Sequence, residues 1–307
     1  MGILETMGTI LRAGDVEVEN TYCEAFDGLY SRLVVTAKNR GLLSKAVNSF
    51  SALPSTVFNK SEGGVEKWLE RKETPDNRPG AVVQLWINQG SNAVANLEYE
   101  LGWRIRQGVL VMPTTRVFNA IDSENKIDTM ERIGHCGDGY EEVREEFGGS
   151  VISIPLMMGD FIIERYLGYA SGIMGGNLWF FCDSQDSALR VGEKAVNEIG
   201  DVEGVITPFG VCAAGSKVET KFPDIGPTTN HLYCPGLRDK LTESAVPQGI
   251  KSIPEVVING KDLESVKKAM KISIDAVKGE KGLLKISSGN YGGKLGKYKI
   301  YLRELIK

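Results

Sequence analysis

The chain has 307 residues, of which 42% are hydrophobic and 25% are charged, and its formal net charge is -4. This composition is that of an ordinary folded protein with room for one large domain or two lobes, and it excludes a disordered chain. A weakly acidic protein without a basic stripe is not expected to bind nucleic acid. No apolar run approaches the roughly 18 residues that a membrane-spanning helix needs, so no membrane partner is expected.

Cysteine and histidine usage indicates the compartment and argues against a metal site. The five cysteines are scattered and include no Cys-x-x-Cys. An odd, scattered set does not form a closed disulfide framework and fits reduced thiols in a cytoplasm. Because His135 and His231 are the only histidines, a histidine-rich site is nearly excluded, and we expect no metal.

The first half of the chain alternates predicted strands and helices after a loose lead-in over residues 1–17. We expect strands at 29–36, 81–87 and 109–112, helices at 42–50 and 94–107, and a possible short helix at 65–71. The segment 73–80 contains two prolines and a glycine, which is typical of a turn-rich loop.

The second half shows a comparable order. Strands are predicted at 151–154, 161–164 and 177–182, followed by a helix that Asp183 or Ser184 can cap and that Gly200 can end. Apolar positions of that helix are Leu189, Ala195, Val196 and Ile199. A strand at 202–207 and a long loop at 208–247 come next.

The last part of the chain predicts a strand, a helix, a returning strand and a glycine loop. In the strand 255–258, alternation places Glu255 and Val257 on one face and the two intervening residues on the other. Asp262 can cap a helix whose apolar positions recur at helical spacing at Val266, Met270, Ile274 and Val277. A strand at 283–287, a loop at 288–296 with four glycines, and a strand at 298–302 complete the chain.

Each half therefore predicts the order strand, helix, strand, strand, helix, strand. This order is typical of the split βαβ or ferredoxin-like unit, in which both helices cover one face of an antiparallel sheet. We predict an α+β protein of two tandem ferredoxin-like lobes, an α/β sandwich, with lobes at 1–150 and 151–307. A doubly wound sheet is the competing interpretation, but no Gly-x-Gly-x-x-Gly lies between a strand and a helix.

Glu255 is the least expected residue of the last segment, because it is a carboxylate among apolar strand residues. It either points into water from an edge strand or performs acid-base work in a site. The glycine loops at 172–177 and 289–296 lead into strands rather than helices, so they predict turns or close backbone approaches rather than phosphate cradles. No Gly-x-Ser-x-Gly is present, and a cysteine nucleophile is a weaker alternative.

Several long motifs resemble one known family. They are Val18–Phe26, Glu73-Thr-Pro-Asp-Asn-Arg-Pro-Gly80, Pro113-Thr-Thr-Arg-Val-Phe-Asn119, Gly137-Asp-Gly-Tyr140, Gly172–Asn177, Glu255-Val-Val-Ile-Asn-Gly260 and Lys285–Tyr298. In order and spacing they are similar to formylmethanofuran:tetrahydromethanopterin formyltransferase, from Val18 to the C-terminus. The resemblance implies two ferredoxin-like lobes, a homotetramer with an active site near a subunit contact, and the cytoplasm of a methanogenic or related archaeon. Large apolar residues such as Trp103, Phe147 and Tyr233 also suggest an assembly, if they lie in exposed loops.

The resemblance also implies a reaction and its residues. The family moves a formyl group between methanofuran and N5 of tetrahydromethanopterin, which are co-substrates, and Glu255 matches the glutamate assigned to acid-base work. Burial on an apolar strand would raise the pKa of that carboxyl group toward neutrality. Backbone N–H groups of 209–214 are candidates for holding the oxyanion. The residues expected to contact substrate are Phe209, Ser216, Lys217, Thr229, Asn230, Tyr291 and Gly292.

The chain departs from the family pattern near this predicted site. Where the family has Pro-Phe-Pro-Gly-Gly-Ile upstream of its Ser-Lys, the chain reads Pro208-Phe-Gly-Val-Cys-Ala-Ala-Gly-Ser-Lys217. By this resemblance we expect the loop as a whole to be two residues shorter than the family's. The segment 49–71 and the N-terminus also differ from the family. Two hypotheses follow: an active formyltransferase, or a catalytically weak or inactive paralogue that binds the pterin or acts as a scaffolding subunit.

Overall fold

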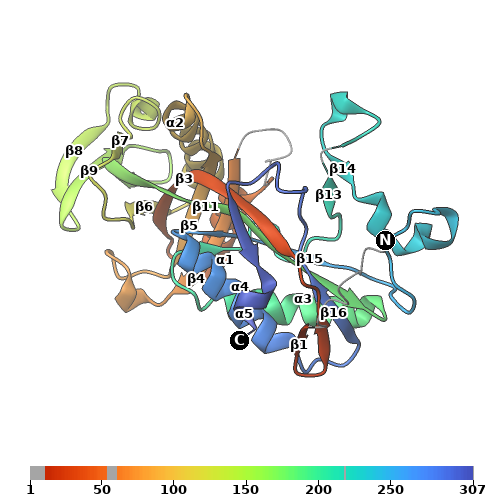
Figure 1. Cartoon of the computed structure of the whole chain (residues 1–307). Helices are drawn as coiled ribbons and strands as arrows, with labels where there is room; N and C mark the ends of the chain where they lie inside the picture. The colour runs from red at the N-terminus through yellow and green to blue at the C-terminus, as the bar shows by residue number, and fades with distance from the viewer. Residues whose placement is uncertain (1–10, 54–60, 218, 307) are drawn as a thin grey trace, which may run out of the picture. The chain divides into compact units, whose positions relative to one another are not determined.

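The computed structural model describes residues 11–53, 61–217 and 219–306, and the chain divides into two compact units (Figure 1). Unit 1 comprises Met1–Phe26 and Ile173–Lys307, and unit 2 comprises Asp27–Gly172. The unit boundaries fall inside the two longest strands, β3 (Tyr22–Thr36) and β11 (Tyr166–Cys182). The lobes predicted from the sequence, 1–150 and 151–307, have different boundaries from these two units. That division stays a prediction.

Unit 2 contains a complete βαββαβ core. Its elements in chain order are β3, α1 (Arg40–Ser51), β4 (Ser61–Leu69), β5 (Gly80–Asn88), α2 (Ala93–Arg104) and β6 (Arg116–Asn119). The strands lie in the order β4-β5-β3-β6, and all neighbours are antiparallel. This is the strand order of the ferredoxin-like unit.

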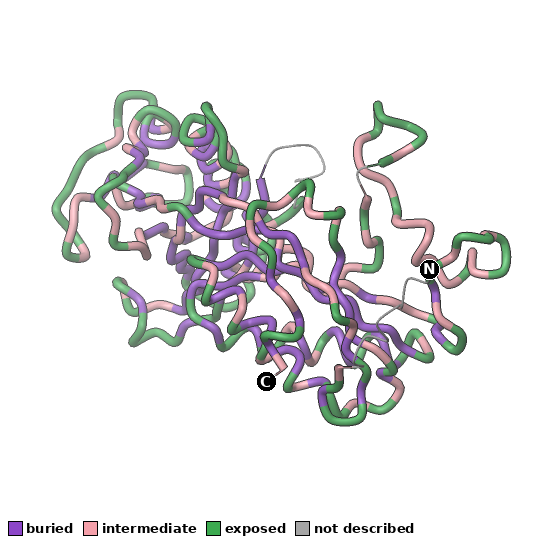
Figure 2. The backbone as a smooth tube through the Cα atoms, viewed as in Figure 1, coloured by how far each residue is buried: buried purple, intermediate pink, exposed green. Residues whose placement is uncertain are grey.

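Four further strands enlarge unit 2 beyond that core. β10 (Phe161–Glu164) pairs with β6, β9 (Gly149–Ile154) pairs with β10, and β8 (Glu142–Glu146) pairs with β9 at the edge. β7 (Lys126–Asp128) pairs with the first residues of β11. Every residue of β8 is exposed, as the green tube in Figure 2 shows, and its charged side chains protect the edge from pairing with other chains.

Unit 1 repeats the same core. Its elements are β11, α3 (Gln185–Ile199), β12 (Val205–Ile206), β15 (Glu255–Gly260), α4 (Leu263–Val277) and β16 (Leu283–Ser287). The strands lie in the order β12-β15-β11-β16, again with antiparallel neighbours. An insertion over residues 207–254 separates β12 from β15, and it carries the small hairpin of β13 (Ser216–Lys217) and β14 (Thr228–Thr229). The two α+β units therefore share one topology, as the sequence predicted.

The remaining elements of unit 1 extend its sheet and end the chain. β2 (Val16–Val18) runs parallel to β16 and forms a hairpin with β1 (Leu11–Ala13), so residues 11–18 are not the loose lead-in that the sequence suggested. β17 (Tyr298–Tyr301) pairs with the start of β3, and the short helix α5 (Leu302–Leu305) follows it.

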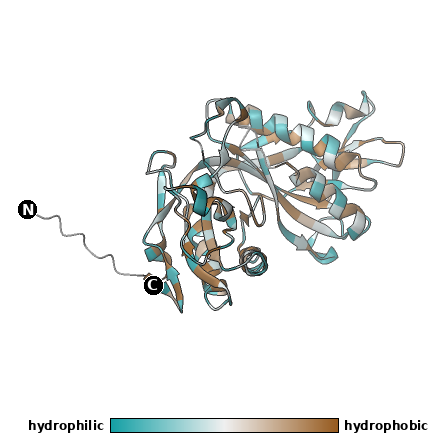
Figure 3. Cartoon of the chain, turned by 90° about the vertical axis from the view of Figure 1, so that its right-hand side faces the viewer, coloured by the Kyte–Doolittle hydropathy of each residue, from teal (hydrophilic) through white to brown (hydrophobic). Residues whose placement is uncertain are grey.

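Amphipathic helices cover one face of each sheet (Figure 3). In unit 1 the buried side of α4 carries Val266, Met270, Ile274 and Val277, as the helical spacing predicted, and Asp262 caps the helix through the N–H of Ser265. Ser184, one of two predicted caps, caps α3. Leu189 was expected among the apolar positions of α3, but its side chain is 55% exposed.

Two local predictions in the first half were wrong. Residues 65–71 are mostly strand, because β4 pairs with β5 along its length and its glycines permit close packing: a Cβ on Gly63 would lie 2.9 Å from Ser51 Cα. Residues 109–112 are not a strand, because α2 continues into a π-helix, Ile105–Leu110, that buries Val109. The strands predicted at 151–154 and 161–164 are present as β9 and β10, and both lie in unit 2.

Candidate active site

Strand pairing in unit 1 brings Glu255 beside a tryptophan. Residue Trp179 of β11 pairs with Glu255 of β15 on one side and with Ser287 of β16 on the other. Side chains of directly opposed residues lie on the same face of a sheet. The indole N–H of Trp179 donates to Glu255 Oε1 at 2.9 Å. As predicted, Val256 and Ile258 face the buried core, whereas Glu255 and Val257 lie on the other face and are only partly buried.

A pocket of about 560 Å³ lies over that face, and Glu255 lines it. Its walls come from four parts of unit 1: β11 near its end, the start of α3, the insertion 207–254, and the first residue of β15. The lining includes Trp179, Cys212, Ala213, Ala214, Asn230, Tyr233, Lys251 and Glu255. A volume of this size accommodates a small organic molecule or one end of a large one.

The environment of Glu255 favours its protonated form. Burial raises the pKa of the carboxyl group above its ordinary value, and the hydrogen bond from Trp179 lowers it in part. The net result is a pKa above that of an exposed glutamate, which suits a carboxyl group that accepts and returns a proton. The interpretation of Glu255 as an exposed charge on an edge strand is therefore excluded, because β15 has a neighbour on each side.

Aromatic rings form the apolar wall of the pocket. Tyr233 meets the ring of Trp179 edge-on with centroids 4.7 Å apart, and it meets Phe181 in the same way at 6.2 Å. Val246 and Ile250 of the insertion pack against the same cluster. Burial is also the main reason that the pKa of the Tyr233 hydroxyl is raised. The insertion thus supplies an apolar wall of the pocket beside Glu255.

The loop 208–217 is tied directly to the strand of Glu255. Cys212 exchanges two backbone hydrogen bonds with Glu255, of 2.8 and 2.9 Å. Its own N–H is therefore used, and the N–H of Gly210 donates to the Thr207 carbonyl. Of the backbone donors expected at 209–214, these two are already engaged. Ala213 and Ala214 line the pocket, so their N–H groups are better placed.

The predicted substrate residues lie around the pocket rather than all inside it. Asn230 lines it, and its backbone N–H donates to the carbonyl of Gly215. Thr229 donates to the carbonyl of Ala214 at 3.2 Å and contacts Cys234 Sγ at 3.5 Å, and both of these neighbours line the pocket. Within the described residues, the lining does not include the other predicted positions, Phe209, Ser216, Lys217, Thr229, Tyr291 and Gly292.

The hairpin and the glycine loop account for most of those positions. The Tyr291 hydroxyl donates to the carbonyl of Ser216 at 3.3 Å, which connects the loop to β13. The ammonium group of Lys217 donates to the carbonyl of Glu219. Gly292 is exposed and has a positive φ of 69°, which is a conformation that favours glycine. Phe209 is half-buried in the loop after β12.

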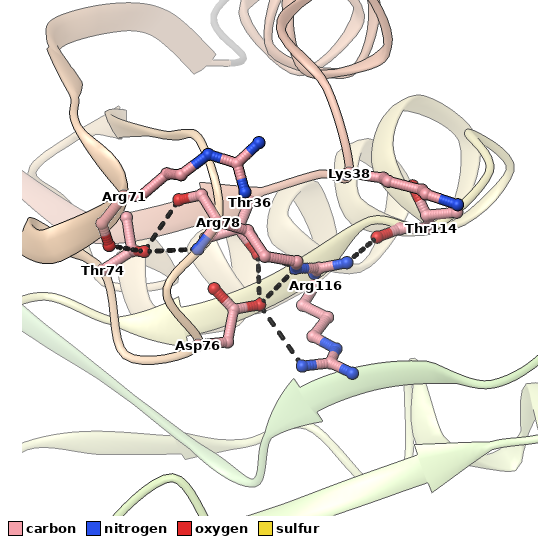
Figure 4. A network of polar contacts seen from close by, with 8 residues as sticks. All are labelled: Thr36, Lys38, Arg71, Thr74, Asp76, Arg78, Thr114 and Arg116. Carbon is pink, nitrogen blue, oxygen red and sulfur yellow. Dashed lines mark hydrogen bonds and ion pairs between the residues drawn. The ribbon is translucent and has the colours of Figure 1, made fainter.

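A second polar cluster lies in unit 2 around Asp76 (Figure 4). The fully buried Asp76 carboxylate accepts from Arg78 Nε at 2.6 Å and from Thr36 Oγ1 at 2.8 Å, and Arg116 lies 3.4 Å away. Arg78 also donates to the carbonyl of Thr114, a residue with the unusual positive φ of 68°. These contacts hold the loop 73–80 against the turn before β6, which is a structural task.

Family models match almost the whole described chain. The description of the first is formylmethanofuran-tetrahydromethanopterin formyltransferase, and it matches residues 11–156; the second, the proximal lobe of the same family, matches residues 159–305. This chain belongs to the formylmethanofuran-tetrahydromethanopterin formyltransferase family. The match covers both units, so the whole chain, and not one core alone, is of the family.

Individual relatives give the same family, but some are named formyltransferase and others formyltransferase-like protein. A formylmethanofuran--tetrahydromethanopterin formyltransferase-like protein of Archaeoglobus fulgidus is 56% identical over 97% of this chain and 99% of its own length. The protein of the same organism that carries the enzyme name without "like" is 40% identical over 96% and 100%. The solved formyltransferase of Methanosarcina barkeri superposes with a TM-score of 0.88, at 39% identity, over 96% of this chain and 100% of that one.

Two further observations concern cofactors and membranes. Among the residues that the structure describes, no group of three or more histidine, cysteine, aspartate or glutamate side chains is placed to hold a metal ion. All five cysteines are free thiols.

Among the residues that the structure describes, no helix is both long enough and apolar enough to span a membrane.

Sequence reasoning missed the residues that surround Glu255. Trp179 was recognised only as part of a buried strand, and Tyr233 only as a large side chain in a loop. Their proximity to Glu255 depends on strand register and on the path of the insertion, and neither is encoded in a local pattern. The signal that could have indicated Trp179 is its indole N–H, because a buried tryptophan needs a hydrogen-bond partner.

Proposed function

We propose that the chain transfers a formyl group between formylmethanofuran and N5 of tetrahydromethanopterin, with Glu255 as the general acid-base. The observation that carries this proposal is the position of Glu255: its carboxyl group lines an apolar pocket, accepts the Trp179 indole N–H and has a raised pKa. Family membership supplies the reaction class, and the pocket supplies the chemistry that the reaction needs.

The proposed mechanism uses no protein nucleophile. The pterin nitrogen attacks the formyl carbon and forms a C–N bond, which gives a tetrahedral intermediate with a negatively charged oxygen. Glu255 takes the proton from the attacking nitrogen and gives it to the methanofuran nitrogen as the second C–N bond breaks. Formylmethanofuran thereby becomes the free amine, and no oxidant or metal is required for the balance.

The oxyanion needs hydrogen-bond donors that are already in place. The backbone N–H groups of Ala213 and Ala214 are the best candidates. Both residues line the pocket, and they follow Cys212, which forms an antiparallel β-bridge with Glu255. The hairpin residues Ser216, Lys217 and Thr229, together with Asn230, are proposed to hold the carriers at the pocket rim. Phe209, Tyr291 and Gly292 are proposed to complete this rim.

A second candidate function has its own support. The relative at 56% identity is named formyltransferase-like, whereas the protein named as the enzyme in the same organism is at 40%. The loop 208–217 is also shorter than the pattern of the family by two residues. A catalytically weak paralogue that binds the pterin is therefore the alternative. Glu255 and its partner Trp179 favour the active enzyme, because a scaffold has no need of a carboxyl group with a raised pKa.

We also propose a homo-oligomer, by family resemblance a tetramer, in an archaeal cytoplasm. Trp103 is 56% exposed on α2 beside Tyr99, which is 47% exposed, and such aromatic surface is typical of contacts. The other two residues that suggested an assembly do not support it: Phe147 packs on Phe118, and Tyr233 packs on Trp179. Sedimentation velocity at micromolar concentration gives the oligomeric state, and a monomer would contradict this proposal.

The test of the function is direct. Purified protein is incubated with formylmethanofuran and tetrahydromethanopterin, and the formation of formyl-pterin is followed with time. Product formation that scales with protein concentration supports the enzyme. Measurable binding of the pterin without any product, in either direction of the reaction, supports the paralogue.

A further inference from the structure

We propose that Trp179 is a positioning residue for Glu255 and that the glycine loop Gly289–Gly296 fixes the place of its indole ring. This inference rests on the proposed acid-base role of Glu255. It adds a series of contacts to the site. The series runs from the loop Gly289–Gly296 through the indole of Trp179 to Oε1 of Glu255.

The first contact in this series is the hydrogen bond of 2.9 Å from Trp179 Nε1 to Glu255 Oε1. Trp179 is 7% exposed, so its ring is held by packing, and within the described residues its indole is the side-chain donor to this carboxyl group. A donor fixed on Oε1 favours the charged form and holds the plane of the carboxyl group. Oε2 is then left to exchange the proton with the two reacting nitrogens.

The second contact is between the ring and the loop. A Cβ built on Gly289 would lie 2.6 Å from Trp179 Cζ2 and 3.0 Å from Cε2. No real side chain tolerates such distances, so either the loop or the ring would have to move. Gly289 is buried and its φ is not in the left-handed region, so the absence of a side chain is explained by the ring rather than by backbone conformation. The backbone of the loop therefore acts as a wall behind the indole.

The third part is the anchoring of the loop itself. Glu24 accepts backbone N–H groups from Tyr291 and Gly293 on Oε1, and from Leu295 and Gly296 on Oε2, at 2.6–2.8 Å. At the start of the loop, the Asn177 amide oxygen accepts from the N–H of Gly289 at 2.8 Å and from the Ser288 hydroxyl at 2.9 Å. Because Asn177 and Trp179 are two residues apart on β11, the strand that presents the indole also holds the loop behind it.

Other ionisable groups face the same pocket and have to be considered in any titration of Glu255. Cys212 comes from the loop 208–217, Cys234 and Tyr233 come from the insertion, and Lys251 precedes β15. Tyr291 of the glycine loop is also influenced by the charge of Glu255. None of these side chains is altered by the substitutions below, so a change in the titration of Glu255 reports the loss of the indole donor.

The experiment compares Trp179→Phe with a matched substitution in unit 2. Trp86→Phe removes another buried indole, which donates to Gln84 Oε1 at 2.8 Å, but Trp86 lies on β5 of unit 2, whereas Glu255 lies on β15 of unit 1. We expect Trp179→Phe to lower kcat about 10- to 100-fold, as for a lost hydrogen bond to a charged group, with little change in KM. The acid limb of its pH-rate profile moves to higher pH, because a donor to the charged form is gone. Trp86→Phe leaves that limb in place.

Two glycine substitutions test the role of the glycine loop apart from that of the indole. Gly289→Ala pushes on the ring and should shift the pH-rate profile in the same direction as Trp179→Phe. Gly279→Ala is its control, because a Cβ there meets nothing within 4 Å. If Trp179→Phe and Gly289→Ala leave the acid limb of the profile where the wild type has it, the proposal is wrong, whatever they do to stability.

A readout without turnover keeps this inference distinct from the proposed function. The Glu255 carboxyl carbon is titrated by NMR in protein labelled with ¹³C-glutamate, and Glu255→Gln assigns the signal. A wild-type protein that transfers no formyl group would remove the proposed function, but the upward shift of the Glu255 titration in Trp179→Phe would still be expected. An unchanged titration in an active enzyme would overturn the inference alone.

Discussion

Replacing Glu24 with glutamine should release the glycine loop, and the size of the effect follows from its four hydrogen bonds. The side chain is 2% exposed, and each carboxylate oxygen accepts two backbone N–H groups. Glutamine replaces one oxygen with an NH₂ donor, so two N–H groups lose their acceptor. Hydrogen bonds to charged groups contribute about 1.5–3 kcal/mol each, so the upper bound is about 3–6 kcal/mol. Because the neutral amide is less costly to bury, we expect a loss of about 3 kcal/mol.

The pH dependence of that loss has a definite sign. Burial alone would raise the pKa of the Glu24 carboxyl group, but the N–H groups of the glycine loop outweigh it, and the pKa is held below its ordinary value. A carboxyl group with a lowered pKa binds fewer protons in the folded state than in the unfolded one. Its stabilising contribution is therefore complete above the pKa of an unfolded glutamate and is lost as the pH falls through the folded pKa. The difference between wild type and Glu24→Gln should shrink over the same acidic range.

The assay has a local and a global part. Hydrogen exchange read by mass spectrometry on the peptide that contains 289–297 reports the loop amides directly, and urea unfolding at several pH values reports the free energy of unfolding. Glu193→Gln, an exposed substitution on α3, is the control and should change stability by no more than about 0.5 kcal/mol. Unchanged protection of the loop amides in Glu24→Gln would refute the reasoning, because it would show that the four contacts do not hold the loop.

Two further predictions address the Asp76 network and the loop 208–217. Asp76→Asn should destabilise the protein by about 3 kcal/mol in urea unfolding, because removing one member of a buried ion pair leaves the Arg78 charge without compensation; a loss below about 1 kcal/mol would show that the network is not structural. Restoring the family's Pro-Gly-Gly-Ile segment after Phe209, at the family's loop length, should raise turnover with little change in pterin binding, because a shift of about 1 Å in the donors can cost on the order of 100-fold in rate. Steady-state kinetics and isothermal calorimetry measure the two quantities, and a wild-type protein that already matches a full-loop family member would contradict this account of the loop.

Periodicity predicted the parts of the fold in which local pattern and burial agree. The helix α4 was found with its cap and all four buried positions, because an amphipathic pattern over four turns has one interpretation. The strand β4 was missed, since two glycines and several charged residues hide its pairing with β5. The apolar run at 109–112 fits a strand and a buried helical turn equally well, and packing of the π-helix decided between them.

The candidate site was predictable only in part. Glu255 stands out in the sequence because a carboxylate in an apolar strand is unusual, and alternation gave its face correctly. Its partner Trp179 lies 76 positions away in the chain and meets it through strand register. Glu24 was included only within the motif Val18–Phe26, because its role depends on four N–H groups of a distant loop. Contacts of this kind are products of the tertiary fold, which no local pattern encodes.

The central claim is that this chain moves a formyl group between its two carriers by means of Glu255. The most direct measurement compares wild type and Glu255→Gln for the rate of formyl-pterin formation and, in the same preparations, for pterin affinity. Glutamine keeps the size of the side chain and its capacity to accept the Trp179 indole N–H, but it cannot take up a proton. We predict that turnover falls by about 100-fold or more while pterin affinity is maintained. Nearly unchanged turnover in Glu255→Gln would contradict the account and remove Glu255 from the mechanism.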